Sequence, residues 1–233
     1  MEILVNKKTA LVFGASGLVG SQLTQQLLDH PAYTTVRIFV RHQLDITHPK
    51  LDQQLIDFNN PVSFEDHIKG NDLFLCLGTT MAKAGSREAF YKVDFTYAYQ
   101  AAQAAVNNGV NQLLLVSAVG ADSNSLFYYS RVKGELEEAV KKLPFWAIHI
   151  LQPSVLLGDR KENRIGERIG ARLSLGAHRL SGGRLGKYEP VEAAVVAGAM
   201  IQSAQQLQSG QFTIPSHELK FLADASGLPE KIR

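Results

Sequence analysis

The chain has 233 residues, which is the size of one α/β domain and enough for a sizeable core. A net charge of +2 is too close to neutral to indicate nucleic acid as a partner. The one cysteine, Cys76, excludes an intramolecular disulfide and suggests no thiolate metal site. No stretch reaches the roughly 18–20 apolar residues that span a bilayer, and no signal-peptide pattern precedes the first strand. We therefore expect a cytoplasmic protein without a membrane partner.

Short apolar runs alternate with helical patterns along most of the chain. Strands are predicted at residues 9–13, 36–40, 54–58, 73–77, 112–116 and 147–151. Helices are predicted after the first strand, where Val19, Leu23 and Leu27 share a stripe, and at residues 97–108 and 131–142. This alternation predicts an α/β fold with a doubly wound parallel sheet. We expect one domain over residues 1–233, in which residues 153–233 contribute a small cap on the substrate side.

A glycine-rich turn follows the first predicted strand and opens the first helix. Gly14 allows a tight turn, Gly17 lets the backbone approach a pyrophosphate, and Gly20 lets the helix pack close to the strand. Free N–H groups at the helix start would hold the phosphates, so Ser16 and Leu18 are also assigned to the cofactor site. The turn predicts dinucleotide binding, although three glycines also occur in ordinary turns.

The end of the second strand indicates which dinucleotide is bound. NAD-binding folds often place an acid about 20 residues after the glycines, whereas Arg41 stands here 21 residues after Gly20. An arginine would bind the 2′-phosphate of NADP, and Arg37 could assist or face solvent. A surface role for Arg41 leaves NAD open. Asp57 and Phe58, at the end of the third predicted strand, are candidates for holding the adenine or for capping the strand.

Tyr129 and Lys133 are four residues apart, which places both on one face of a helix. A nearby ammonium stabilises the phenolate, and so tunes a tyrosine to exchange a proton with a substrate oxygen. Ser117 ends the fifth predicted strand, where its hydroxyl could polarise a substrate carbonyl or bond its own turn. These three residues are the candidate catalytic group.

Together these segments resemble the short-chain dehydrogenase/reductase superfamily, and among its atypical NAD(P)-binding members the Tat-interacting oxidoreductase-like family. The similarity extends from about residue 9 to about residue 199, and it is carried by residues 14–20, 76–80, 86–94, 117–122, 129–135 and 152–160. It implies a Rossmann fold and a catalytic triad of Ser117, Tyr129 and Lys133.

The resemblance also implies further cofactor contacts. Gly78 and Thr79 would border the ribose, where Lys133 would also bind, and Pro153 and Val155 would lie along the nicotinamide. The chain departs from the family pattern at two positions. Asp94 stands near the place where extended members carry an asparagine, and Gln152 replaces an arginine that commonly precedes the proline.

Three other features have structural explanations. Residues 158–188 carry eight basic residues against three acidic ones, which indicates a solvated face or a cap that attracts an anion. His149, in the sixth predicted strand, is expected to be a core histidine with satisfied hydrogen bonds. Cys76 lies in an apolar strand and is expected to be packing rather than a nucleophile.

The sequence thus favours an NADP-dependent oxidoreductase that transfers hydride to or from a small carbonyl or alcohol, as a monomer or homodimer. A second hypothesis is an NADP-binding regulatory protein that controls a protein partner with little or no turnover. A third, an NAD-dependent epimerase or dehydratase, is weakened by Arg41 and by the short C-terminal part.

Overall fold

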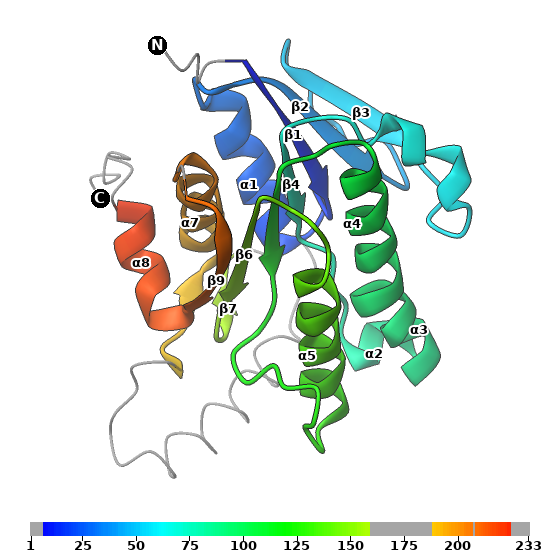
Figure 1. The fold of residues 1–233 in the computed structure, drawn as a ribbon, viewed down its shortest axis with the longest axis vertical. Helices are drawn as coiled ribbons and strands as arrows, with labels where there is room; N and C mark the ends of the chain where they lie inside the picture. The colour runs from blue at the N-terminus through cyan, green and yellow to red at the C-terminus, as the bar shows by residue number, and fades with distance from the viewer. Residues whose placement is uncertain (1–6, 159–187, 207, 225–233) are drawn as a thin grey trace.

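A seven-stranded parallel sheet forms the centre of the computed structural model, which describes residues 7–158, 188–206 and 208–224 (Figure 1). Its strand order is β3-β2-β1-β4-β5-β6-β9, and every neighbouring pair is parallel. The strands are β1 (Lys8–Phe13), β2 (Tyr33–Val40), β3 (Leu51–Leu55), β4 (Asp72–Leu75), β5 (Gln112–Val116), β6 (Ala147–Gln152) and β9 (Gly210–Pro215). A separate parallel pair joins β7 (Leu156–Leu157) to β8 (Val191–Glu192). The predicted Rossmann fold, in one domain, is confirmed.

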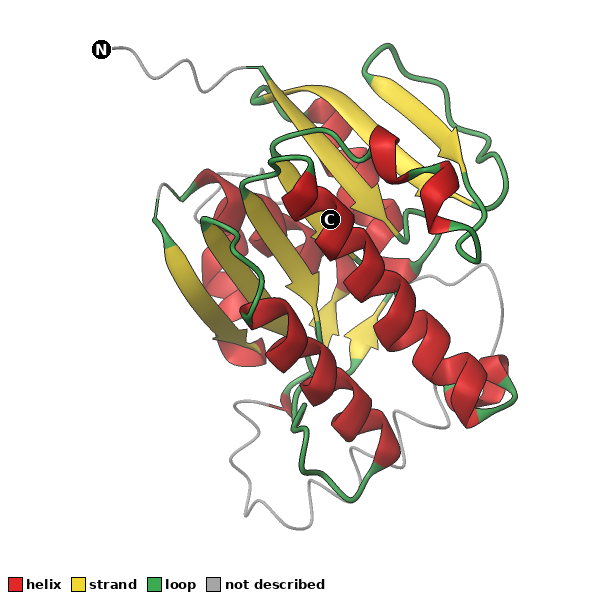
Figure 2. Cartoon of the chain, turned by 45° about the vertical axis from the view of Figure 1, so that its right-hand side comes forward, coloured by secondary structure: helices red, strands yellow, loops and turns green. Residues whose placement is uncertain are grey.

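Helices cover both faces of the sheet, which divides the apolar interior into two cores. On one face lie α1 (Leu18–Asp29), α7 (Ala193–Gln205) and α8 (Ser216–Asp224), which bury Leu23 and Met200. On the other face α4 (Tyr97–Asn107) and α5 (Tyr128–Lys141) bury Ala101 and Leu136 (Figure 2). The shorter helices are η1 (Pro61–Ser63), η2 (Glu65–His67), α2 (Met81–Ala84), α3 (Arg87–Tyr91) and the π-helical turn η3 (Lys92–Thr96). Strands buried on both sides explain why the sequence shows continuous apolar runs.

The strand order reverses beside β1, and this reversal positions the site. The chain moves outward from β1 through β2 to β3, then crosses back to β4 and continues to β9. The helices that follow β1 and β4 therefore lie on opposite faces of the sheet, and the carboxyl ends of these two strands are where such folds bind ligands. Gly14 follows β1, Gly78 follows β4 and Ser117 follows β5, so the parallel register brings all three to this edge.

Buried polar groups close the opposite, amino edge of the sheet. Asp72 accepts hydrogen bonds from Tyr33 Oη at 2.6 Å, from Gln112 Nε2 at 2.9 Å and from Lys8 Nζ at 3.1 Å. Burial raises the pKa of Asp72, although Lys8 and these hydrogen bonds oppose the shift. Both carboxylate oxygens of Asp72 thus have partners, although the buried Oε1 of Gln112 has none among the described residues, and the amino edge is a structural network.

Several predicted elements differ from those observed. The third strand ends at Leu55 rather than at residue 58, so Asp57 and Phe58 follow it. The sequence patterns did not predict α7, β9 and α8; β9 adds the last strand to the sheet, and the two helices pack on the same face as α1. β9 is an edge strand with only one fully buried residue, Ile214, and it therefore lacks a continuous apolar run. Most of the basic segment 158–188, and with it much of the expected cap, falls in residues 159–187, outside the described residues.

His149 is a core residue, as expected, but its hydrogen bonds are not satisfied. Its side chain is fully buried in β6, and neither ring nitrogen has a hydrogen-bond partner in the described structure. The ring instead stacks on Phe212 of β9, with 5.0 Å between centroids. Burial lowers the pKa of His149 from 6.5 to about 4, so the imidazole is neutral at physiological pH.

This burial predicts an acid-sensitive fold. Below pH 6.5 the unfolded chain binds a proton at His149 that the folded chain cannot bind until the pH reaches about 4. Stability is therefore lost as the pH falls through this window, by about 2–3 kcal/mol. We expect His149→Leu to reduce the loss, as measured by urea unfolding at pH 7 and pH 4.5. The exposed His42→Leu variant is the control, and an identical loss in both variants would contradict the assignment.

Candidate active site

The glycine turn between β1 and α1 is shaped by close backbone contacts. Gly14 has a φ of +88°, and a Cβ there would lie 2.5 Å from the carbonyl oxygen of Cys76. A Cβ on Gly20 would lie 2.0 Å from the carbonyl oxygen of Gly14. Both glycines are thus required by packing. Gly17 differs, because its φ of −81° is ordinary and its surface is exposed.

The exposed start of α1 has the properties of an anion site. Gly17 is the N-cap residue, and it makes no side-chain capping bond. The first turn of α1 contains no acidic residue. The first N–H groups of a helix lack intrahelical partners and lie at the positive end of the helix dipole. With the exposed Ser16 and the half-buried Leu18, the turn fits a dinucleotide phosphate.

A buried ion pair lies beside the end of β4. Lys133 Nζ of α5 is 2.8 Å from Asp94 Oδ1, and their side chains are only 5% and 0% exposed. A Cβ on Gly78 would lie 3.5 Å from Asp94 Oδ1 and 3.6 Å from Lys133 Nζ. Both distances are ordinary van der Waals contacts, so Gly78 places the backbone that follows β4 directly beside the ion pair.

Asp94 fixes the lysine and the adjoining backbone together. Its Oδ2 accepts a hydrogen bond of 2.8 Å from the Thr79 backbone N–H. Burial lowers the pKa of Lys133, but the carboxylate of Asp94, with smaller contributions from Tyr129 and Glu137, outweighs burial and raises it. Lys133 is consequently held as an ammonium. Asp94 lies in the π-helical turn η3, a local distortion that is frequent at functional sites.

Ser117 is bound to a second buried carboxylate. Its Oγ donates a hydrogen bond to Glu137 Oε1 of α5, and both residues are 5% exposed. Gln152 Nε2 donates to both carboxylate oxygens of Glu137, at 3.0 and 3.1 Å. Sequence reasoning missed Glu137, although it stands four residues after Lys133 and thus one helical turn further along α5.

Tyr129 stands in the first turn of α5, one helical turn before Lys133. Its side chain is 42% exposed, and its ring lies 5.9 Å from that of Phe90. Within the described part of the chain, no hydrogen bond ties down its hydroxyl group. Tyr129 and Lys133 thus lie on α5, and Ser117, which directly follows β5, contacts the same helix through Glu137.

The two arginines near the end of β2 differ in their contacts. Arg37 Nε is 2.6 Å from Asp52 Oδ2, and Arg37 also donates to the carbonyl of His67. The guanidinium of Arg37 is therefore already paired within the fold, which disfavours a role for it in cofactor binding. Arg41 is exposed just beyond β2 and makes no ion pair or hydrogen bond to the described residues.

Asp57 and Phe58, the two residues predicted to contact the adenine, each interact with neighbouring residues of the chain. Asp57 is exposed, and its carboxylate accepts a hydrogen bond from the backbone N–H of Asn59. Phe58 is only 8% exposed and packs edge-to-face on Phe13. These contacts favour a turn-forming role for Asp57 and a packing role for Phe58.

The segment after β6 is tied to its neighbours by backbone bonds. The Pro153 carbonyl accepts from Val119 N–H, and the Val155 carbonyl accepts from Val191 N–H, both at 2.9 Å. Cys76, after β4, packs its sulfur 3.8 Å from that of Met200. Burial raises the pKa of Cys76 to about 12, so the thiol is not a nucleophile at neutral pH.

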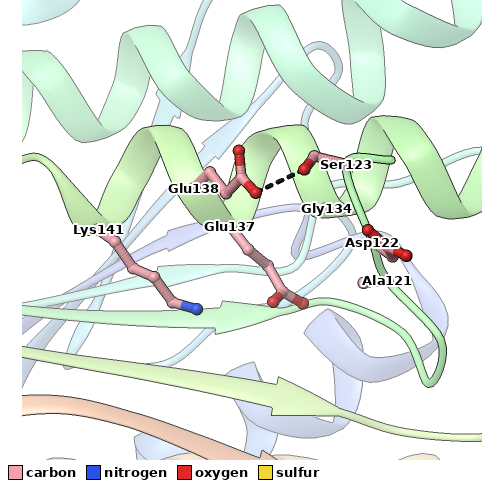
Figure 3. Close-up of a pocket in the computed structure, with 7 residues that line it drawn as sticks. All are labelled: Ala121, Asp122, Ser123, Gly134, Glu137, Glu138 and Lys141. Atoms are coloured by element: carbon pink, nitrogen blue, oxygen red, sulfur yellow. Dashed lines mark hydrogen bonds between the residues drawn. The ribbon is translucent and has the colours of Figure 1, made fainter. Parts of the chain in front are cut away.

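A pocket of about 200 Å³ lies between α5 and the loop that follows β5 (Figure 3). It is lined by Ala121, Asp122, Ser123, Gly134, Glu137, Glu138 and Lys141. Gly134 lets the loop pack directly on the helix, since a Cβ there would lie 2.2 Å from the Ser123 nitrogen. The Glu138 carboxylate accepts from Ser123 Oγ on the outer side of the helix. Glu137 is thus shared between this pocket and Ser117.

Comparison with known proteins gives concordant results. The model of an NAD(P)H-binding family matches residues 14–167. "Protein FMP52, mitochondrial" from Candida albicans is 34% identical, over 87% of this chain and 90% of that protein. "Protein HTATIP2" from Rattus norvegicus is 35% identical, over 70% and 69%. The solved structure titled "MoeE5 in complex with UDP-glucose and NAD" is 16% identical in sequence and covers 94% of this chain and 82% of that one. Its TM-score of 0.67 shows that the two chains share a fold.

These relatives correct the expected location. The proteins from Candida albicans, Candida glabrata and Saccharomyces cerevisiae are all named as mitochondrial, which contradicts the prediction of a cytoplasmic protein. The prediction failed because it depended on the absence of a recognisable leader, which is weak evidence of compartment. Among the described residues, no helix has the length and hydrophobicity to cross a membrane.

The family match covers more than half of the chain, and the relatives match most of it at more than 30% identity. Together with the glycine turn and the lysine beside Gly78, they establish that the chain belongs to the NAD(P)H-binding family and is a relative of FMP52 and HTATIP2.

Proposed function

We propose that the protein is an NADP-dependent oxidoreductase that acts on a small carbonyl or alcohol. The observation that carries this proposal is the buried Lys133–Asp94 pair directly beside Gly78, on the same helix as the exposed phenol of Tyr129. A fixed ammonium, a phenol on the same helix and a glycine at the end of β4 are among the groups that carbonyl–alcohol chemistry on a dinucleotide requires.

The cofactor would be held along the carboxyl edge. Gly14, Ser16, Gly17, Leu18 and Gly20 would hold the pyrophosphate, and Arg41 the 2′-phosphate. Gly78, Thr79 and Lys133 would border the ribose, and Pro153 and Val155 the nicotinamide. Asp57 and Phe58 are the least supported contacts, because each already has a local partner. When bound, the nicotinamide supplies or accepts the hydride.

The remaining chemistry belongs to side chains of this chain. Tyr129 is assigned the hydrogen bond to the reacting oxygen and the exchange of its proton. Lys133 favours the phenolate through its positive charge and binds ribose hydroxyls. Ser117 orients the substrate oxygen. Asp94 positions Lys133 and, through Thr79, the backbone beside it.

Arg41 predicts a preference for the phosphorylated cofactor. A guanidinium without a partner in the described chain is available for a 2′-phosphate, so NADPH should bind more tightly than NADH. Arg41→Ala should lose about 1.5–3 kcal/mol of NADPH binding energy while NADH affinity stays nearly constant. Calorimetry on both cofactors measures the difference, with His42→Ala as the neighbouring control. Equal affinities in the unmodified protein would exclude the assignment.

Tyr129→Phe tests the proposed reaction. The substitution removes only the hydroxyl, so folding and NADPH affinity should change little. Turnover on the best substrate of a carbonyl and alcohol panel, followed by nicotinamide absorbance, should fall on the order of 100-fold or more. Tyr128→Phe is the matched control, because this adjacent hydroxyl donates to the carbonyl of Arg87.

Two outcomes would count against this mechanism. Unchanged turnover in Tyr129→Phe would remove the tyrosine from the reaction. If no panel substrate reacts with the NADPH-bound protein, a regulatory protein that binds its partner according to NADP occupancy becomes the better hypothesis.

A further inference from the structure

Exposed apolar side chains gather where the chain leaves β5 and β6. Ten large apolar side chains are exposed among the residues that the structure describes. Four of them, Leu126, Phe127, Tyr129 and Leu157, belong to the segments that follow these two neighbouring strands. Single exposed apolar residues are ordinary on a protein surface, whereas a concentration of them at one edge indicates a binding surface.

This part of the edge is where a substrate must lie if the cofactor binds as proposed. The cofactor would extend from Arg41 after β2, past the glycine turn after β1, to Gly78 after β4. The next two strands of the sheet are β5 and β6, whose trailing segments would border the nicotinamide. These segments stay joined beyond the strands, since Val119 N–H donates to the Pro153 carbonyl. The exposed apolar residues therefore belong to the substrate side of the proposed site.

Leu126 and Phe127 directly precede the helix that carries the proposed catalytic tyrosine. Their side chains are 95% and 78% exposed, yet local hydrogen bonds fix the loop that carries them. Asp122 N–H donates to the Ser130 carbonyl at 3.0 Å, and Phe127 N–H donates to Ser125 Oγ at 3.2 Å. An ordered backbone thus presents both apolar side chains, close to the tyrosine at the second position of α5.

Phe127 is an unusual residue for its position in the fold. It is the N-cap of α5, and its side chain makes no capping hydrogen bond. Serine, threonine, aspartate and asparagine are preferred at this position because their oxygen accepts from a free N–H of the first turn. The chain uses such residues at α2 and α3, which Thr80 and Ser86 cap. An exposed phenylalanine at the start of α5 therefore lowers stability, which indicates a role other than stability.

The segments that form this surface carry no charge. Neither residues 123–130 nor residues 153–157 contain an acidic or basic side chain. These two segments therefore supply no partner for a carboxylate, a phosphate or an ammonium of a substrate. Because covering a charged group without a partner is costly, the surface fits the uncharged, apolar part of a ligand.

We propose that Leu126 and Phe127 bind the apolar part of the substrate, and that the substrate is an uncharged aldehyde or ketone with an aliphatic or aromatic side chain. The proposal rests on the proposed oxidoreductase function and names its substrate class. The reaction is unchanged, because the carbonyl carbon gains the hydride of the nicotinamide and the carbonyl oxygen gains the proton of Tyr129. Contact with the two apolar side chains would hold the carbonyl group beside the phenol.

The dependence of turnover on chain length tests the substrate class. Covering one methylene on an apolar surface strengthens binding about two- to fourfold, so kcat/KM should rise by this factor per methylene from propanal to hexanal. Hexanal should also exceed 6-oxohexanoate, which carries a carboxylate at the end of the same chain, by at least about tenfold. A kcat/KM that is flat over the series, or that is higher for 6-oxohexanoate, would overturn the proposal.

Phe127→Ser separates substrate binding from packing. The serine oxygen would cap α5, so the melting temperature should rise by about 2–4 °C. In the same variant kcat/KM for hexanal should fall about tenfold, while that for propanal stays within about twofold. Leu126→Ser should lower the hexanal value without the rise in melting temperature. Phe221→Ser is the matched control, because this phenylalanine is 77% exposed on α8, and it should change neither kcat/KM.

Other outcomes in Phe127→Ser would assign the side chain a different role and reject the proposal. A lower melting temperature would show that the phenylalanine packs within the chain. A changed molecular mass in light scattering, with unchanged dependence on chain length, would assign the surface to a contact between two copies. Equal losses of kcat/KM for propanal and hexanal would show that the substitution displaces the catalytic tyrosine.

Binding of aliphatic amides covers the case in which no substrate reacts. Amides carry a carbonyl group but resist hydride transfer, so a series from propanamide to octanamide reports the apolar contact alone. In the NADPH-bound protein, calorimetry should show an affinity that rises with chain length, and Phe127→Ser should weaken octanamide binding about tenfold. This dependence without turnover on any aldehyde would reject the oxidoreductase function alone. An affinity independent of chain length would reject the apolar substrate surface.

Discussion

Two opposite charges, Lys133 and Asp94, lie almost completely out of water at the carboxyl edge of the sheet. Removing either charge alone would leave the other buried and unpaired, at a cost of about 3–5 kcal/mol. The pair therefore fixes α5 relative to η3, and the Thr79 contact extends the constraint to the end of β4. Gly78 lies directly beside both charges. This constraint is therefore located where we propose that the cofactor binds, and it preorganises the site.

The two edges of the sheet use buried polar groups differently. At the amino edge Asp72 accepts hydrogen bonds from Tyr33, Gln112 and Lys8, and these contacts hold its carboxylate inside the fold. At the carboxyl edge, by contrast, some of the polar groups are exposed to solvent. Gly17 leaves the start of α1 uncapped, and Tyr129 has an exposed phenol. Gly14 and Gly20 pack so closely that a Cβ at either position would collide with backbone atoms. This close packing shapes the turn whose outer residue, Gly17, is exposed.

Much of the architecture could be predicted from sequence because its signals are local. Strands buried on both faces give continuous apolar runs, and the turn chemistry of Gly14 and Gly20 is dictated by contacts within a few residues. β9 was missed because an edge strand need not be apolar. The unsatisfied ring of His149 could not be foreseen either, because burial in a strand does not specify which polar groups lie opposite it.

The supporting residues of the site were harder to predict than its reactive ones. Tyr129 and Lys133 stand on one helix, so their spacing alone places them on one face. Asp94 meets Lys133 only through tertiary packing, and the π-helical turn that carries it changes the register that helical spacing would give. Glu137 has the right spacing from Lys133, but its partners are Ser117, which follows β5, and Gln152, which ends β6.

The central claim is that Lys133, held by Asp94, binds the cofactor rather than only stabilising the fold. The most direct measurement is the calorimetric NADPH affinity of the double variant Lys133→Met/Asp94→Leu, in which no unpaired charge remains buried. Arg131→Met/Glu135→Leu is the control, because it removes a half-exposed ion pair from the same helix. We predict that the double variant folds but binds NADPH at least about tenfold more weakly, since a charge-assisted contact contributes about 1.5–3 kcal/mol. A folded double variant with the affinity of the unmodified protein would contradict the claim.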